Sequence, residues 1–136
     1  MEIIAIAAVT LLIIMGLFHI YWAFGGTIGL DKALPTKDGV RLFNPGRVLT
    51  FIVGTVLFGF SFVAYSLCFD AANADATVYT GWVLSALFVI RAVGEFNAVG
   101  FFKKIRSTEF AAYDTKYFSP LCLFLGVVFA LLSAQS

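Results

Sequence analysis

The chain alternates between long apolar stretches and shorter polar segments. The apolar stretches cover residues 3–24, 47–69, 78–102 and 118–134. At about 1.5 Å rise per residue, helices of these lengths match a hydrocarbon core roughly 30 Å thick. The pattern therefore predicts an all-α fold, a four-helix transmembrane bundle, with residues 1–136 forming a single membrane domain.

Small residues recur along one face of several of these predicted helices. The positions are Ala5, Ala8, Gly16, His19 and Ala23 in the first helix, Gly54, Ser61 and Cys68 in the second, and Ser119, Cys122, Gly126, Ala130 and Ser133 in the fourth. Small side chains let helices approach closely in lipid, so these faces are expected to pack against other helices.

Two of the three connections are long and polar. In residues 25–46, the dipeptide Asp38-Gly39 is typical of a two-residue β-hairpin turn. Residues 103–117 have the composition of a short amphipathic helix on the membrane surface. Ser119 can cap the last helix, and Pro120 fits its first turn, where no backbone N–H is needed.

Basic residues flank only the first and third connections. They are Lys32, Lys37, Arg41 and Arg47 around the first, and Lys103, Lys104, Arg106 and Lys116 around the third. The second connection and both termini have no Lys or Arg. By the positive-inside rule, both long loops are expected in the cytoplasm and both termini outside.

Composition supports the membrane assignment. Of the 136 residues, 61% are hydrophobic and 12% are charged, whereas soluble domains carry about 25% charged residues. The net charge of +1 gives no general attraction for nucleic acid. Cys68 and Cys122 should lie near opposite membrane surfaces, far beyond the ~7 Å Cα limit for a disulfide, so both are predicted to be free thiols.

The third apolar stretch carries the most informative polar residues. Arg91 and Glu95 are four residues apart and would share one face of a helix through residue 102. A charge within a membrane span costs at least ~2.5–3.5 kcal/mol unless it is paired or hydrated. Depth along the helices predicts a cluster in the cytoplasmic half, formed by His19, Trp22, Arg91 and Glu95, with Tyr113 and Asp114 entering from the loop below.

Two interpretations of this cluster stay open. In the structural one, Arg91 and Glu95 neutralise each other and His19 forms a hydrogen bond between helices. In the functional one, His19 and Glu95 are candidate catalytic residues for acid–base chemistry, and Arg91 binds a carboxylate or phosphate headgroup. Whether the protein is an enzyme is therefore left open.

The sequence gives little support for a bound cofactor or a metal site. The single histidine, His19, cannot form a bis-histidine site within one chain. The glycines Gly25, Gly26 and Gly29 follow no predicted strand and do not form a dinucleotide fingerprint. We expect neither a metal nor a cofactor.

Three functions fit these observations. The first is a membrane protein that binds or processes an amphiphilic, lipid-like molecule in a polar pocket in the cytoplasmic half of the bundle. The second is a structural or accessory subunit, in which the small-residue faces bind a second copy or another membrane protein. The third is a small transporter or proton path. Each has the lipid bilayer as its surroundings, and none involves nucleic acid.

Short motifs along the chain also carry a resemblance. They are His-x-x-Trp-Ala-x-Gly-Gly at His19 to Gly26, Asn-Pro-Gly at Asn44 to Gly46, Arg-x-x-Gly-acid-Phe at Arg91 to Phe96, Gly-Phe-x-Lys at Gly100 to Lys103, and Tyr-Asp…Ser-Pro-Leu-Cys at Tyr113 to Cys122. Together they resemble a family of small four-span bacterial membrane proteins that carries a domain-of-unknown-function label. The resemblance implies the four-span fold, a place in the bacterial inner (cytoplasmic) membrane and no established activity. The family more often has Asp where this chain has Glu95.

Overall fold

A computed structural model of the chain contains four long helices and one small hairpin. The helices are α1 (Glu2–Ala23), α3 (Arg47–Phe69), α4 (Asp75–Val93) and α6 (Ser119–Gln135), and the π-helical turn η1 (Asp114–Phe118) leads directly into α6. The structure describes residues 2–26, 36–37, 40–41, 46–70, 75–94, 100 and 112–135. Apart from the two short strands of the hairpin, every element in these ranges is helical, which confirms the predicted all-α fold.

The described helices are long and apolar enough to cross a membrane. The four candidate spans are Glu2–Ala23, Arg47–Phe69, Asp75–Val93 and Asp114–Gln135. Their length and composition indicate a multi-pass membrane protein, as the sequence predicted.

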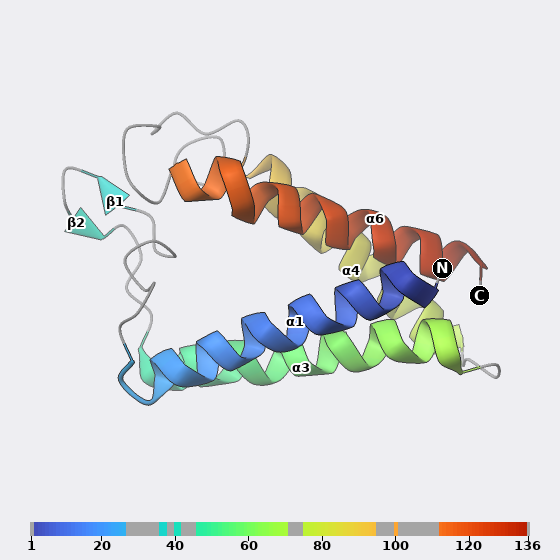
Figure 1. Cartoon of the computed structure of the whole chain (residues 1–136), viewed down its shortest axis with the longest axis horizontal. Coiled ribbons are helices and arrows are strands. Elements are labelled where there is room, and N and C mark those ends of the chain that lie inside the picture. The colour runs from blue at the N-terminus through green and yellow to red at the C-terminus, as the bar shows by residue number, and fades with distance from the viewer. Residues whose placement is uncertain are drawn as a thin grey trace.

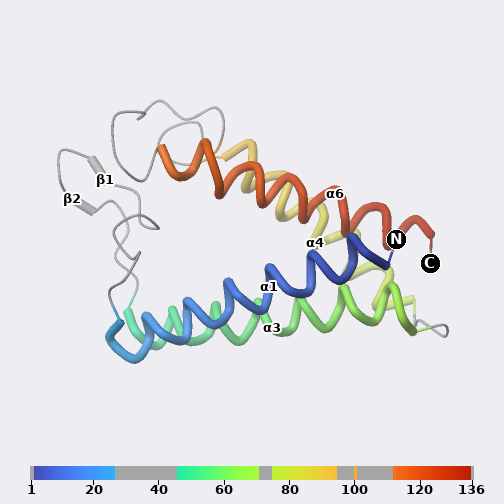
Figure 2. The backbone as a smooth tube through the Cα atoms, in the orientation of Figure 1, coloured from blue at the N-terminus to red at the C-terminus, as the bar shows by residue number. Residues whose placement is uncertain are grey.

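The helices are arranged as two antiparallel pairs. Helix α1 packs along α3, and α4 packs along α6. The two pairs meet at the end of the bundle that holds both termini and diverge toward the other end (Figures 1 and 2). We call these the terminal end and the open end. The open end holds Ala23, Arg47, Val93 and Asp114, where the four spans begin or finish.

Aromatic rings connect the two pairs near mid-depth. The ring of Phe88 in α4 lies 6.0 Å from that of Phe60 in α3 and 5.9 Å from that of Phe129 in α6. Leu12 and Leu132 are fully buried and belong to the same apolar core. This core closes the bundle on its terminal side and leaves the open end less tightly packed.

Small residues bring the helices of each pair together. In the first pair, a Cβ atom added to Gly54 would lie 3.1 Å from the backbone oxygen of Gly16. In the second pair, the Ser85 hydroxyl donates a 2.7 Å hydrogen bond to the backbone oxygen of Gly126. The predicted small-residue faces are therefore confirmed as packing faces, and they are used inside the chain.

The third span is shorter at the open end than the sequence suggested. The predicted helix over residues 78–102 is wrong in its bounds, because α4 begins at Asp75 and ends at Val93. Gly94 follows with a φ of +87°, a left-handed conformation that commonly ends helices because glycine adopts it without strain. Arg91 consequently lies in the last turn of α4 rather than one turn deeper in the membrane.

The fourth span starts earlier than predicted. Ser119 has helical dihedrals and its N–H bonds to the backbone oxygen of Asp114, so it is not an N-cap. Pro120 has no N–H to donate to the carbonyl of Lys116, and the wider π turn accommodates this missing bond. Asp114 therefore belongs to the helical span and not to the loop below it.

Three smaller expectations can also be compared with the structure. Strand β1 (Thr36–Lys37) pairs antiparallel with β2 (Val40–Arg41), so residues 38–39 connect them and the predicted hairpin is confirmed. Cys68 and Cys122 are both free, as expected. The predicted surface helix falls mainly on residues 103–111, outside the described ranges.

Candidate functional site

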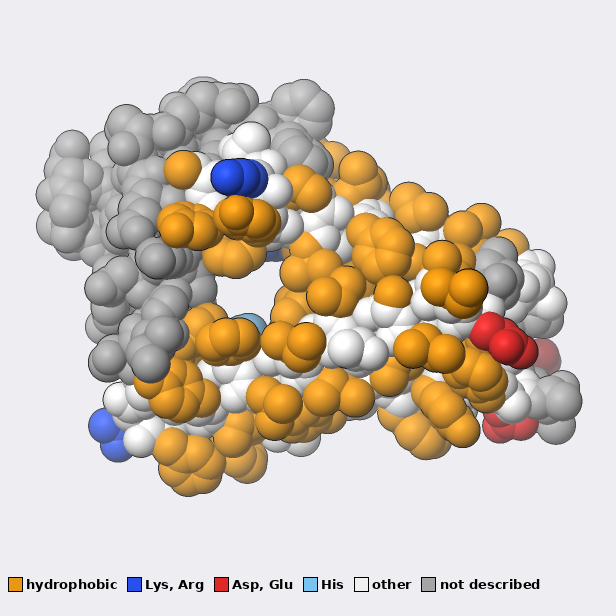
Figure 3. All heavy atoms as spheres, viewed as in Figure 1, with side chains coloured by type: hydrophobic (Ala, Val, Ile, Leu, Met, Phe, Trp, Pro, Cys, Tyr) orange, Lys and Arg blue, Asp and Glu red, His pale blue; other side chains and the backbone are white. Residues whose placement is uncertain are grey.

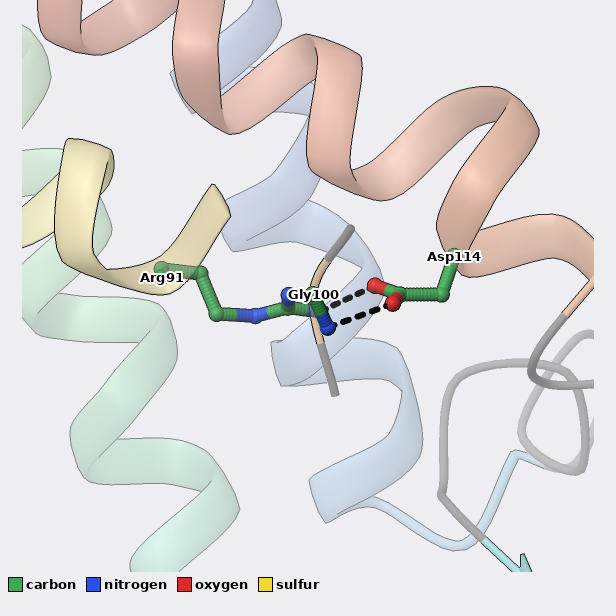
Figure 4. A network of polar contacts seen from close by, with 3 residues as sticks. All are labelled: Arg91, Gly100 and Asp114. Carbon is green, nitrogen blue, oxygen red and sulfur yellow. Dashed lines mark hydrogen bonds and ion pairs between the residues drawn. The ribbon is translucent and has the colours of Figure 1, made fainter. Parts of the chain in front are cut away.

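An ion pair between Arg91 and Asp114 marks the open end of the second helix pair. The Nη2 atom of Arg91 lies 2.8 Å from Oδ1 of Asp114, whose side chain is fully buried. The other carboxylate oxygen, Oδ2, accepts a 2.7 Å hydrogen bond from the backbone N–H of Gly100 (Figure 4). One buried carboxylate therefore holds the end of α4, the start of η1 and residue 100 together.

Local structure explains why this carboxylate can be buried. A buried charge is tolerated when it is paired and hydrogen-bonded, and Asp114 has a guanidinium and a backbone donor. Gly100 reaches it with a φ of +91°. A Cβ atom at that position would lie 2.5 Å from the Gly94 Cα atom, so only glycine fits.

One edge of the Arg91 guanidinium is not used by this network. Its Nη1 atom is buried and has no hydrogen-bond partner in the part of the chain that the structure describes. The side chain as a whole is 33% exposed. A guanidinium presents five N–H donors, and one bond to Asp114 leaves most of them available.

His19 lies on the other helix pair. Its Nδ1 atom is 2.7 Å from the backbone oxygen of Met15. Because a carbonyl oxygen only accepts, Nδ1 carries the hydrogen, and in the neutral ring Nε2 is left as an acceptor. The ring of Trp22 packs edge-on against it at 5.1 Å. His19 is therefore half-buried and oriented by its Nδ1 atom and the Trp22 ring.

The predicted cluster is divided between the two pairs. Arg91 and Asp114 meet on α4 and η1, and Tyr113 stacks on Tyr117 beside them at a ring distance of 5.7 Å. His19 and Trp22 meet on α1. The contacts of Arg91 with Asp114 and of His19 with Met15 and Trp22 each stay within one helix pair.

Glu95, the predicted partner of Arg91, lies outside the described residues. The spacing argument that paired it with Arg91 no longer applies, because α4 ends at Val93. The observed partner of Arg91 is Asp114, which the sequence offered as a more distant member of the cluster. Gly100 was not foreseen as a donor, although it begins the Gly-Phe-x-Lys motif at Gly100 to Lys103.

An opening separates the two helix pairs at the open end. Figure 3 shows it between the α1–α3 pair and the α4–α6 pair, with mainly hydrophobic side chains on its visible walls. The acidic residues at the terminal end are Glu2, Asp70 and Asp75, and the described basic residues with placed side chains all lie at the open end. The molecule thus combines an apolar hollow with basic residues at the same end of the bundle.

Metal binding has no geometric basis among these residues. The described ranges contain no group of three His, Cys, Asp or Glu side chains close enough to hold an ion. Cys122 is buried within electrostatic range of Arg91 and Asp114, but it is the only thiol there in the described part of the chain.

Comparison with known proteins gives one match. Neither the curated proteins nor the solved structures contain one that matches this chain. The family described as "Protein of unknown function (DUF3995)" matches residues 12–129, a range that includes all of α3 and α4, parts of α1 and α6, and both halves of the site. The chain therefore belongs to the DUF3995 family.

Proposed function

We propose that this protein binds an amphiphilic, lipid-like molecule between its two helix pairs at the open end. The observation that carries the proposal is the unpartnered, buried Nη1 atom of Arg91 at the end of the bundle where the pairs diverge. Ligand sites are typically apolar hollows with a few oriented polar groups, which is the combination seen here. His19 is the described side chain suited to proton transfer if the ligand is also processed.

The same proposal includes an orientation. Arg47, Arg91 and Lys116 lie at the open end, where Asp114 is paired with Arg91, while Glu2, Asp70 and Asp75 lie at the terminal end (Figure 3). By the positive-inside rule, this distribution supports an open end that faces the cytoplasm. We therefore place the ligand in the cytoplasmic leaflet of a bacterial cytoplasmic membrane.

The two alternatives have weaker support. The small-residue faces that suggested a homo-oligomer or an accessory subunit pack within the chain, so they no longer argue for a partner. A transport path would need polar groups through the whole depth. Near mid-depth, Leu12, Leu125 and Phe129 are fully buried and close the bundle.

Native mass spectrometry of the protein released from a mild detergent tests the proposal. The wild type should carry a discrete extra mass, and fragmentation of that species identifies the ligand class. The variant Arg91→Ala/Asp114→Asn removes both charges together and should lose or weaken this mass. Lys116→Ala removes an exposed cation at the same end and serves as the matched control. A wild type free of ligand in lipid-supplemented detergent would overturn the proposal.

A further inference from the structure

We propose that the ligand carries an oxyanion head, a phosphate or a carboxylate, which docks on the Nη1 edge of Arg91. In this scheme Asp114 is a positioning residue that fixes the guanidinium and leaves the Nη1 edge without a hydrogen-bond partner. The inference rests on the proposed function and specifies the ligand that the open end selects.

The geometry of the ion pair gives the first argument. Arginine and carboxylate groups often pair through two parallel hydrogen bonds that use both oxygens. Here Oδ1 of Asp114 takes Nη2, and Oδ2 is occupied by the N–H of Gly100. The pair is held by one short bond, and Nη1 remains for a second acceptor.

The chemistry of the unused donor gives the second argument. A buried donor on a charged group is costly to leave without an acceptor, and no described residue supplies one to Nη1. Hydrogen bonds between a guanidinium and an oxyanion are about twice as strong as those between neutral groups. Asp114 already balances the charge of Arg91, and Arg47, at the start of α3 on the facing pair, adds a positive charge to the open end that favours an anion.

Position within the bundle gives the third argument. Helix α4 has 19 residues and is about 28 Å long, so Arg91 in its last turn lies near the level of lipid headgroups. The opening between the helix pairs is visible from the side of the bundle (Figure 3), the direction from which lipids approach. An amphiphile could therefore enter sideways, with its tail between the apolar walls and its head at Arg91.

A competition experiment tests this selection. Delipidated protein in an uncharged detergent is given an equimolar mixture of phosphatidylglycerol and diacylglycerol, which has the same acyl chains and no oxyanion. The lipid retained is then read by native mass spectrometry. We expect roughly tenfold preference for phosphatidylglycerol, as one charge-assisted hydrogen bond would give. The preference should persist in Lys116→Ala. It should disappear in Arg91→Ala/Asp114→Ala, which should retain less lipid than the wild type and hold the two lipids equally.

Variants of Asp114 test its positioning role. Asp114→Asn keeps the shape and the oxygen acceptor of the side chain, so most of the preference should remain. Asp114→Ala releases the guanidinium, so this variant should lose the preference for phosphatidylglycerol even when it is folded. Equal preference in both variants would show that Asp114 does not position Arg91.

The remaining outcomes separate the two proposals. If a large excess of inorganic phosphate displaces phosphatidylglycerol, the oxyanion site is confirmed and its source is a free anion. If both lipids are retained equally, the oxyanion inference fails while the amphiphile proposal stands. If neither lipid nor phosphate is retained by the folded wild type, both fail.

Discussion

Arg91 and Asp114 stand 23 residues apart in the chain, and their side chains meet at 2.8 Å where α4 ends and η1 begins. The contact is possible because two local features determine where each of these residues lies. Gly94 stops α4 just after Arg91, and the π turn extends the last span back to Asp114. The pair therefore joins the two helices at the open end.

Removing Arg91 and removing Asp114 should lower the stability of the protein by different amounts. Arg91→Ala leaves a fully buried carboxylate with a backbone donor and no counterion. We expect it to lower the free energy of unfolding by roughly 3 kcal/mol, the lower end of the range for a broken buried pair, since Arg91 is 33% exposed. Asp114→Ala should cost less, because water can reach the remaining guanidinium. Denaturant unfolding in micelles, followed by circular dichroism, measures both.

The double variant Arg91→Ala/Asp114→Ala provides the control for this prediction. With both charges gone, no uncompensated charge stays buried, so its loss should be smaller than the sum of the two single losses. Additive losses would mean that the two side chains do not depend on each other in the folded protein.

A second prediction concerns the close approach of α1 and α3. A Cβ atom on Gly54 would lie 2.9 Å from Ile20 Cδ1, 3.1 Å from the backbone oxygen of Gly16 and 3.2 Å from His19 Cβ. Because the Gly16 backbone cannot move alone, Gly54→Val should force the helices apart and destabilise the protein by about 1–3 kcal/mol. Thermal unfolding in detergent reports the change.

Gly59 on the same helix is the matched control. Nothing lies within 4 Å of a Cβ atom added there. Gly59→Val should therefore leave the unfolding temperature nearly unchanged. Equal effects at Gly54 and Gly59 would show that the loss reflects valine in α3 rather than packing against α1.

The span architecture could be predicted from the sequence because it follows from composition. Length and hydropathy identified four spans, and the spacing of small residues identified packing faces that include Gly16, Gly54 and Gly126. These signals are local, and lipid leaves few other ways to satisfy the backbone. The two-residue connection at Asp38-Gly39 was predictable for the same reason, since its turn chemistry is local.

The bounds of α4 and the partner of Arg91 were harder to predict. Gly94 is tolerated within many helices, so the sequence did not show that here it would end one. In a helix that continues through residue 95, the four-residue spacing favoured Glu95 over Asp114 as the partner of Arg91. Asp114 was underestimated because Ser119 and Pro120 resemble a helix start, whereas the π turn continues the helix past them.

The arrangement of the helix pairs had no signal in the sequence. His19 and Arg91 were predicted at similar depth, and both do lie toward the open end. Depth along the membrane normal does not determine the lateral distance between helices. At the open end the two helix pairs diverge (Figure 2). The predicted single cluster is therefore two groups on facing helix pairs. They lie on the two sides of an opening and do not form one packed polar core.

A third prediction concerns Gly100. Its N–H donates to Asp114 at 2.7 Å, its φ is +91°, and a Cβ atom would lie 2.5 Å from Gly94 Cα. Gly100→Ala should therefore displace this backbone from Asp114 and lower stability by about 1–3 kcal/mol. Gly46→Ala is the control, since nothing lies within 4 Å of a Cβ atom there. A neutral Gly100→Ala would mean that this hydrogen bond is not needed for folding.

The last prediction concerns orientation in the membrane. In a chain with Cys68→Ala and Cys122→Ala, new thiols are introduced singly through Gln135→Cys and Lys116→Cys, both at exposed positions on opposite ends of the last span. If the positive open end faces the cytoplasm, a membrane-impermeant maleimide should label intact cells only at position 135. Position 116 should react only after the membrane is permeabilised. The reverse pattern would invert the proposed orientation and place the Arg91 site in the outer leaflet. Labelling of both positions in intact cells would contradict the assignment of this helix as a membrane span.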